Sequence, residues 1–284
     1  MRQRRYKTTI AALAIAVNMI GTISTTASYA LSTPSHLGIH KRNPKDGADM
    51  VYVPSGKFIM GTDDFTDATP HAVILDSYWI YTTPVTVAQY RKFCKTTGHQ
   101  FPPAPSFGWS DNNPIVNVNW DDAQAYAKWA SASLPTEAQW EKAAKGTDGR
   151  QYPWGNTWDA QLCANSVLHS LHSTKPVGSY PRGASPYGAL DMAGNVWQWC
   201  SDYYRADYYS SSPSNNPPGP NTPTIGDSGT DPDPNAGTPS PHVLRGCAWN
   251  YNDPDLFGSS VRSSGYGYQG HNGNIGFRCA VSAR

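Results

Sequence analysis

The sequence lacks an excess of charge of either sign, and this excludes two classes of partner. Lys and Arg together number 22, Asp and Glu together number 21, and charged residues make up 15% of the chain. A protein that binds nucleic acid or an anionic membrane surface through its charge carries a basic excess. We therefore expect neither nucleic acid nor an anionic membrane surface among the partners.

The sequence also lacks long hydrophobic runs. Residues 10–20 are apolar but too short to cross a bilayer. Basic residues precede this run, and residues 28–30 (Ser-Tyr-Ala) fit a cleavage site. We predict a signal peptide over residues 1–30, and a periplasmic or secreted protein without membrane insertion. Removing its four basic and no acidic residues leaves 18 Lys and Arg against 21 Asp and Glu. An Arg-Arg pair at residues 4–5 leaves twin-arginine export open.

Cysteine is scarce, with five residues in the whole chain. Export permits disulfides, but an odd number leaves at least one thiol outside any pair within the chain. Cys163, His169 and His172 have the spacing of a soft-metal site. No fourth ligand is evident, so we interpret the two histidines as ordinary loop residues.

Turn residues and aromatic residues are abundant, with 25 Gly, 24 Pro, 10 Trp and 17 Tyr. This composition predicts a loop-rich fold with an aromatic core. Capping signals predict three helices, which begin after Thr86, Asn119 and Thr136. Short strands are predicted as a hairpin of residues 50–54 with 57–61, and within residues 71–81, 242–249, 259–263 and 275–281. Together these elements predict an α+β fold.

Composition also divides the chain into parts. Residues 31–48 are polar, with Pro and Gly, and are predicted to form a linker. Residues 49–284 are predicted to form one domain. Within it, residues 205–241 are rich in Pro, Ser and Asn and poor in apolar residues. We predict a flexible insert there.

Residues 186–204 (PYGALDMAGNVWQWCSDYY) combine turn residues, two tryptophans and several side-chain oxygens. Carboxylate and amide oxygens, together with carbonyls freed by an irregular turn, are the ligands that calcium prefers. Composition alone leaves two interpretations open, a calcium site and a core strand without an ion. It favours the core strand.

Five separated motifs follow one another at fixed spacing. They are LPTEAQWE (134–141), YPWGN (152–156), GALDMAGNVWQW (188–199), LRG (244–246) and IGFR (275–278), and Pro-Val-Thr at residues 84–86 precedes them. Together they resemble the formylglycine-generating-enzyme (sulfatase-modifying factor) domain family over residues 50–283. The resemblance implies an α+β fold that is a complex variant of the C-type-lectin-like fold, with little regular secondary structure.

The chain departs from this family where the family enzymes hold their metal. Those enzymes oxidise a cysteine of a sulfatase with oxygen and a copper ion, which two cysteines bind. At these two positions the chain has Tyr251 and Leu256, and Ala248 replaces the active-site serine. We therefore predict neither copper nor formylglycine generation. The signal peptide and the missing pair are similar to exported maturation members of the family, including one that completes the fluorophore of the siderophore pyoverdine.

The resemblance also implies a structural calcium site in residues 186–204. Its ligands would be Asp191, the carbonyls of Gly194 and Val196, and Gln198, where the family has Glu. Because an amide carries no charge, this replacement should lower the affinity for calcium. A second family site has an asparagine at Asn165, but its acidic partner falls in a shortened part of this chain, so we do not predict that site.

Two disulfide bonds are possible in this chain. Lectin-like folds often join the first helix to the last strand, which implies a Cys94–Cys279 bridge. Cys200–Cys247 is a second possible pairing. The sequence does not fix the pairing.

Two functions remain open for the segment that follows the LRG motif. The first is an oxidase-type maturation factor acting on a peptide or peptide-derived metabolite, such as a siderophore precursor. Its catalytic candidates are Cys247, Tyr251 and Arg262, and its substrate-binding candidates are Arg245, Trp249 and Tyr266. The second is a non-catalytic C-type-lectin-like binding module for a protein, peptide or glycan. Each arginine either faces a cleft or pairs with a buried acid, and the aromatic residues either line a groove or belong to core and surface.

Overall fold

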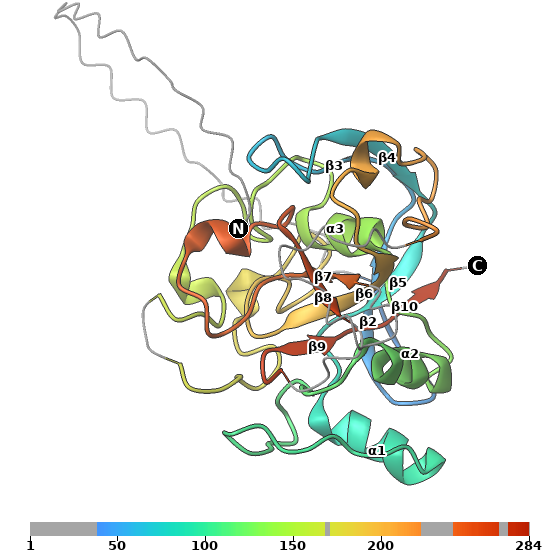
Figure 1. Cartoon of the computed structure of the whole chain (residues 1–284), viewed down its shortest axis with the longest axis vertical. Helices are drawn as coiled ribbons and strands as arrows, with labels where there is room; N and C mark the ends of the chain where they lie inside the picture. Colours follow the sequence, from blue (N-terminus) through green and yellow to red (C-terminus); the bar gives the residue numbers. More distant parts are fainter. Residues whose placement is uncertain (1–38, 168–170, 223–240, 267–271, 284) are drawn as a thin grey trace, which may run out of the picture.

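The computed structural model describes residues 39–167, 171–222, 241–266 and 272–283 (Figure 1). The predicted signal peptide lies outside the described residues. Within the described ranges, no helix is both long enough and apolar enough to cross a membrane.

Three α-helices form where the capping signals predict them. They are α1 (Val87–Thr97), α2 (Trp120–Trp129) and α3 (Glu137–Lys145). Each begins with a capping box, which satisfies two backbone N–H groups that have no partner inside the helix. Four short 3-10 turns follow α3 in the described part of the chain: η1 (Ala160–Leu162), η2 (Pro181–Gly183), η3 (Tyr208–Ser210) and η4 (Pro254–Phe257).

The described strands form two four-stranded sheets and one hairpin. The first sheet has the order β1 (His40–Arg42), β2 (Asp49–Val53), β5 (Tyr78–Tyr81) and β10 (Ala280–Ser282). The second has the order β8 (Arg262–Tyr266), β7 (Pro241–Arg245), β6 (Trp197–Tyr203) and β9 (Ile275–Phe277). The hairpin consists of β3 (Gly56–Met60) and β4 (His71–Leu75). β6 and β9 are parallel, and the other pairs are antiparallel.

The predicted hairpin of residues 50–54 with residues 57–61 is wrong. β2 pairs with β5, and β3 pairs with β4 instead. β2 lies inside the first sheet between β1 and β5, and most of its side chains are buried. β3 and β4 alternate buried and exposed side chains and lie against α3. The hairpin and α1 lie at opposite ends of the molecule (Figure 1).

The fold begins before the predicted boundary at residue 49. β1 lies inside the range predicted as a linker and pairs with β2. Asp46, in the turn between them, is buried. Its carboxylate accepts hydrogen bonds from the hydroxyls of Tyr81 at 2.7 Å and Tyr126 at 2.6 Å. Residues 40–48 are therefore tied to the core.

The predicted insert, residues 205–241, is described as far as residue 222. This part packs on the fold, since Tyr208 and Tyr209 are buried. The N–H of Ile74 in β4 also donates to the carbonyl of Ser214 at 2.7 Å. Residues 223–240 lie outside the described residues, and Pro241 is the first residue of β7.

The core is aromatic, as the composition predicts. The rings of Tyr90 in α1 and Tyr126 in α2 stack with centroids 5.7 Å apart. Phe277 of β9 meets both rings edge-on. Trp140 of α3 and Trp199 of β6 are buried beside the second sheet. Two helices are thus joined to the sheets by ring contacts.

Candidate functional site

Residues 245–256 run from the end of β7 into η4 and include the two positions where the family resemblance implies metal-binding cysteines. The chain turns sharply after β7, because Gly246 has a φ of 95° and Cys247 has a φ of 62°. A Cβ atom at Gly246 would lie 3.0 Å from the ring of Trp140. The left-handed conformation and this close approach both favour glycine.

Backbone hydrogen bonds hold the segment against two other loops. The N–H of Trp249 donates to the carbonyl of Asn195 at 3.1 Å. Ser166 donates from its N–H to the carbonyl of Tyr251 at 2.8 Å, and from its hydroxyl to the carbonyl of Trp249 at 2.9 Å. Trp249 and Tyr251 therefore stand on a fixed backbone.

Two ring pairs lie at this segment, and Trp197 is their buried member. The ring of Trp249 meets that of Phe107 edge-on at 5.9 Å, and its indole N–H donates to the carbonyl of Gly273 at 3.1 Å. The ring of Tyr251 meets that of Trp197 edge-on at 5.9 Å. Trp249, Tyr251 and Phe107 are partly exposed. We call Phe107, Trp197, Trp249 and Tyr251 the aromatic face.

Cys247 does not reach this surface. Its side chain is completely buried, whereas reactive cysteines are partly exposed. Its position therefore fits a packed thiol. Tyr266 is the last residue of β8, and its backbone pairs with Pro241. The side chain of Tyr266 lies outside what the structure describes.

Arg245 and Arg262 pair with buried acids, which is the second of the two alternatives that the sequence leaves open. Both arginines are completely buried. Arg262 Nε donates to Glu137 Oε1 at 2.7 Å, and its Nη2 donates to Glu137 Oε2 at 3.0 Å. Arg245 donates to Glu137 at 3.2 Å and also to Glu141. Neither guanidinium faces a cleft, so neither fits its predicted role towards a substrate.

The third cation of this network is Lys145, the last residue of α3. Lys145 Nζ donates to Glu141 Oε1 at 3.2 Å. Burial alone would raise the pKa of Glu141, but Lys145 and Arg245 lower it to about 2. Glu141 is therefore ionised at neutral pH. We call Glu137, Glu141, Lys145, Arg245 and Arg262 the ion network.

The sequence interpretation missed Glu137 and Glu141. Both lie in the LPTEAQWE motif, four residues apart, so they share one face of α3. Trp140 lies beside them and is buried. Two acids four residues apart beside a buried tryptophan were the signal of a buried ion network.

The contacts of Gln198 do not fit calcium ligation. Its Oε1 accepts hydrogen bonds from Arg278 Nε at 2.6 Å and from Trp140 Nε1 at 2.9 Å. Its Nε2 donates to the carbonyl of Asp191 at 2.7 Å. A cation at Gln198 Oε1 would lie beside the guanidinium of Arg278, which is unfavourable. The predicted set of four ligands therefore does not fit calcium.

The other predicted ligands lie on a buried turn. Asp191 is buried, and its carboxylate accepts a hydrogen bond from the N–H of Gly178 at 2.8 Å. The carbonyl of Gly194 accepts a hydrogen bond from the N–H of Val196 at 2.9 Å. Calcium at Asp191, Gly194 and Val196 stays a prediction, which a thermal melt with and without a chelator would test.

The predicted Cys94–Cys279 bridge is not formed, and all five cysteines are buried as thiols in the described part of the chain. The two positions lie in different surroundings. Burial raises the pKa of Cys94 to about 11, and nearby Asp122 adds to the shift. Burial also raises the pKa of Cys279, which has Asp46 and Tyr81 beside it.

The Cys200–Cys247 bridge is not formed either. Burial raises the pKa of Cys200 well above its usual value, and the carboxylates of Asp202 and Glu137 add to the shift. Cys200 thus lies beside the ion network. Its thiol stays protonated there.

The predicted loop of Cys163, His169 and His172 is only partly described, because His169 lies outside the described residues. Cys163 is buried, and its sulfur lies 3.5 Å from Asn165 Nδ2. Asn165 Nδ2 also donates to the carbonyl of Cys163 at 2.8 Å. Within the described part of the chain, no three His, Cys, Asp or Glu side chains are grouped to hold a metal ion.

The fold and this site define an α+β domain with partly exposed aromatic rings where the family resemblance implies metal-binding thiols. Residues 37–283 match the family model described as the sulfatase-modifying factor enzyme 1-like domain, and the chain belongs to this family. The predicted fold, a complex variant of the C-type-lectin-like fold, is thereby confirmed.

Two relatives place the chain within the family. The formylglycine-generating enzyme of Streptomyces coelicolor is 33% identical, over 84% of this chain and 91% of that protein. The hercynine oxygenase of Mycolicibacterium smegmatis is also 33% identical, over 55% of this chain and 46% of that protein.

Two solved structures share the fold. PvdO from Pseudomonas aeruginosa superposes with a TM-score of 0.68 and 24% identity, over 86% of this chain and 98% of that one. Treponema denticola variable protein 1 gives a TM-score of 0.64 and 21% identity, over 87% of this chain and 99% of that one. At this identity the likeness concerns the fold alone.

Proposed function

We propose that this protein is an exported, oxidase-type maturation factor that acts on a peptide-derived aromatic substrate, such as a siderophore precursor. The observation that carries the proposal is the aromatic face. Two partly exposed rings on a fixed backbone, Trp249 and Tyr251, occupy the segment that binds copper in the family enzymes. The names of the relatives, an oxygenase and a formylglycine-generating enzyme, support an oxidation.

The proposed reaction is a dehydrogenation by molecular oxygen. One carbon–nitrogen or carbon–carbon single bond of the substrate loses two electrons and two protons and becomes a double bond. O₂ takes up both electrons and both protons and becomes hydrogen peroxide. An electron-rich aromatic substrate can supply the electrons itself, so the step needs no thiolate.

The residues of the aromatic face would bind and orient this substrate. Trp249 and Tyr251 offer ring surface for stacking and exclude water from one side of the substrate. Beside them, Asn274 Nδ2 donates to Asn250 Oδ1 at 3.2 Å. Asn250 is exposed and Asn274 is partly exposed, so both amides can bond to polar groups of the substrate.

An oxidation assay tests the proposal. The probe is the dihydro form of a pyoverdine-type fluorophore, and O₂ uptake, peroxide and product absorbance are followed together. We expect the full mature chain to oxidise the probe faster than buffer does, and Trp249→Ala to lower the rate about tenfold or more. Trp79→Ala is the matched control, because Trp79 is partly buried on β5 against Tyr52. A rate equal to that in buffer, or equal losses in both variants, would refute the proposal.

A non-catalytic binding module is the second candidate. The burial of Cys247, Arg245 and Arg262 favours it, because these predicted reactive groups do not face solvent. In that case the probe would quench the fluorescence of Trp249 on binding, and no peroxide would form.

A further inference from the structure

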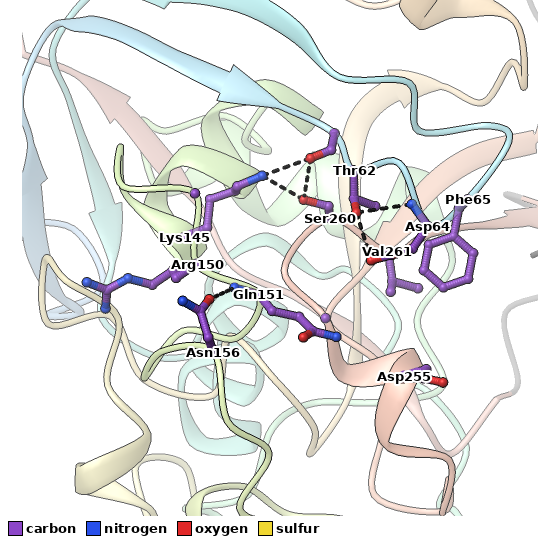
Figure 2. A pocket seen from close by; sticks show the side chains of 13 residues that line it. Thr62, Asp64, Phe65, Lys145, Arg150, Gln151, Asn156, Asp255, Ser260 and Val261 are labelled. Carbon is purple, nitrogen blue, oxygen red and sulfur yellow. Dashed lines mark hydrogen bonds between the residues drawn. The ribbon is translucent and has the colours of Figure 1, made fainter. Parts of the chain in front are cut away.

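A cavity of about 290 Å³ lies between the end of α3, the loop after β3 and the segment that follows η4 (Figure 2). Its walls include Thr62, Asp64, Phe65, Gln151, Ser260 and Val261. The volume is close to the lower end of small-molecule sites, roughly 300 to 1,000 Å³. No residue of the aromatic face lines it, although Asp255, in η4, does. The cavity is therefore distinct from the aromatic face.

The ammonium group of Lys145, which lines the cavity, is already neutralised. Its Nζ donates to the carbonyl of Gly61 at 2.9 Å, to Glu141 Oε1 at 3.2 Å and to Ser260 Oγ at 2.8 Å. An ammonium has three N–H donors, and all three are used here. Lys145 therefore has no N–H left for an anionic ligand.

The other basic side chain at the cavity, Arg150, extends away from its centre (Figure 2). Arg150 Nε and Nη2 donate to the carboxylate of Asp148 at 2.9 Å and 2.6 Å. Its Nη1 donates to the carbonyl of Pro153 at 2.9 Å. Both positive charges at the cavity are thus balanced, and an anionic ligand would find no unpaired cation.

The carboxylate of Asp64 differs from these two cations, because no ion pair balances its charge in the described part of the chain. It is partly buried and lines the cavity. Within the described part of the chain it accepts one hydrogen bond, from Thr62 Oγ1 at 3.0 Å, and makes no ion pair. A carboxylate partly withdrawn from water is stabilised by an opposite charge nearby. Phe65 and Val261 lie next to Asp64 and supply an apolar wall (Figure 2).

We propose that this cavity binds a small organic cation, that is, an ammonium or guanidinium group at the end of a short carbon chain. Asp64 holds the charge, and the carbon chain lies against Phe65 and Val261. The side-chain amide of Gln151 accepts a further hydrogen bond from the cation. A neutral sugar fits less well, because Phe65 is only 8% exposed and offers no open ring face for stacking.

Titration calorimetry on the full mature chain tests this site, with n-butylammonium chloride as the probe and 1-butanol as its neutral isostere. We expect saturable binding of the ammonium at one site and no saturable binding of the alcohol. Asp64→Asn should weaken ammonium binding about tenfold or more. Asp63→Asn is the matched control, because Asp63 is exposed, does not line the cavity and gives the same change in net charge. It should alter binding by less than about twofold.

Gln151→Glu provides a second variant, which tests the site even if Asp64→Asn does not fold. Gln151 is exposed, so the fold should tolerate a carboxylate there. The added charge should tighten ammonium binding by about threefold or more. The proposal is overturned if Asp64→Asn folds and binds the ammonium as wild type does, if 1-butanol binds as tightly, or if Gln151→Glu does not tighten binding. Saturable binding of methyl glucoside without binding of the ammonium would also overturn it.

Discussion

The ion network and the aromatic face are built from neighbouring residues of one chain segment, yet they differ in almost every respect. Arg245 belongs to the LRG motif, is completely buried and pairs with acids from the LPTEAQWE motif. Trp249 and Tyr251 follow within six residues, where the chain departs from the family enzymes, and both are partly exposed. The motifs that identify the family thus build its interior. We propose that function depends on the residues that stand in place of the thiols.

The largest expected effect is the loss of stability when the ion network is broken. Arg245→Met leaves Glu141 buried without one of its cations, so we expect a loss of roughly 3 to 5 kcal/mol in the free energy of unfolding, measured in urea. Arg42→Met is the control, because the Arg42–Asp49 pair is exposed on both sides, and it should cost less than about 0.5 kcal/mol. Equal losses of unfolding free energy in the two variants would contradict the difference between the buried ion network and an exposed ion pair.

A smaller effect on stability is expected at Asp202, whose carboxylate accepts a hydrogen bond from the backbone N–H of Glu137 in the ion network. Burial raises the pKa of Asp202 to about 7, and nearby Glu137 contributes to the shift. The usual value for Asp is 3.8. The folded protein therefore retains a proton that the unfolded chain releases, and its stability falls as the pH rises between these two values. Asp202→Asn removes this loss.

We therefore expect Asp202→Asn to gain about 1 to 2 kcal/mol of stability relative to wild type between about pH 5 and about pH 8. Urea unfolding at both pH values measures the gain. Asp121→Asn, an exposed acid in the first turn of α2, should show a constant difference from wild type. A constant difference for Asp202→Asn as well would contradict a raised pKa.

The sequence predicts the elements of this fold better than their partners. The three helix starts follow from Thr86, Asn119 and Thr136, because capping depends on side chains only three residues apart. The pairing of β2 with β5 depends on contacts between residues far apart in the chain, and the local hairpin signal gave the wrong partner for β2.

The sequence likewise predicts only part of the candidate site. The motifs located the segment after β7, and the absence of two cysteines predicts that the family's metal chemistry is absent. The direction of the Arg245 side chain stayed open until the fold placed it beside Glu137 and Glu141. The cavity left no signal in the sequence, because only the tertiary structure places Asp64 and Gln151 around one cavity.

One comparison tests most directly whether the chemistry of this chain lies on the aromatic face and not on a thiol. Cys247→Ala and Trp249→Ala are assayed side by side for oxidation of the dihydro fluorophore, after thermal melts show that both variants are folded. Because Cys247 is completely buried, we expect Cys247→Ala to keep the wild-type rate within about twofold, and Trp249→Ala to lose about tenfold. A folded Cys247→Ala variant that loses the activity, beside a Trp249→Ala variant that keeps it, would contradict this assignment.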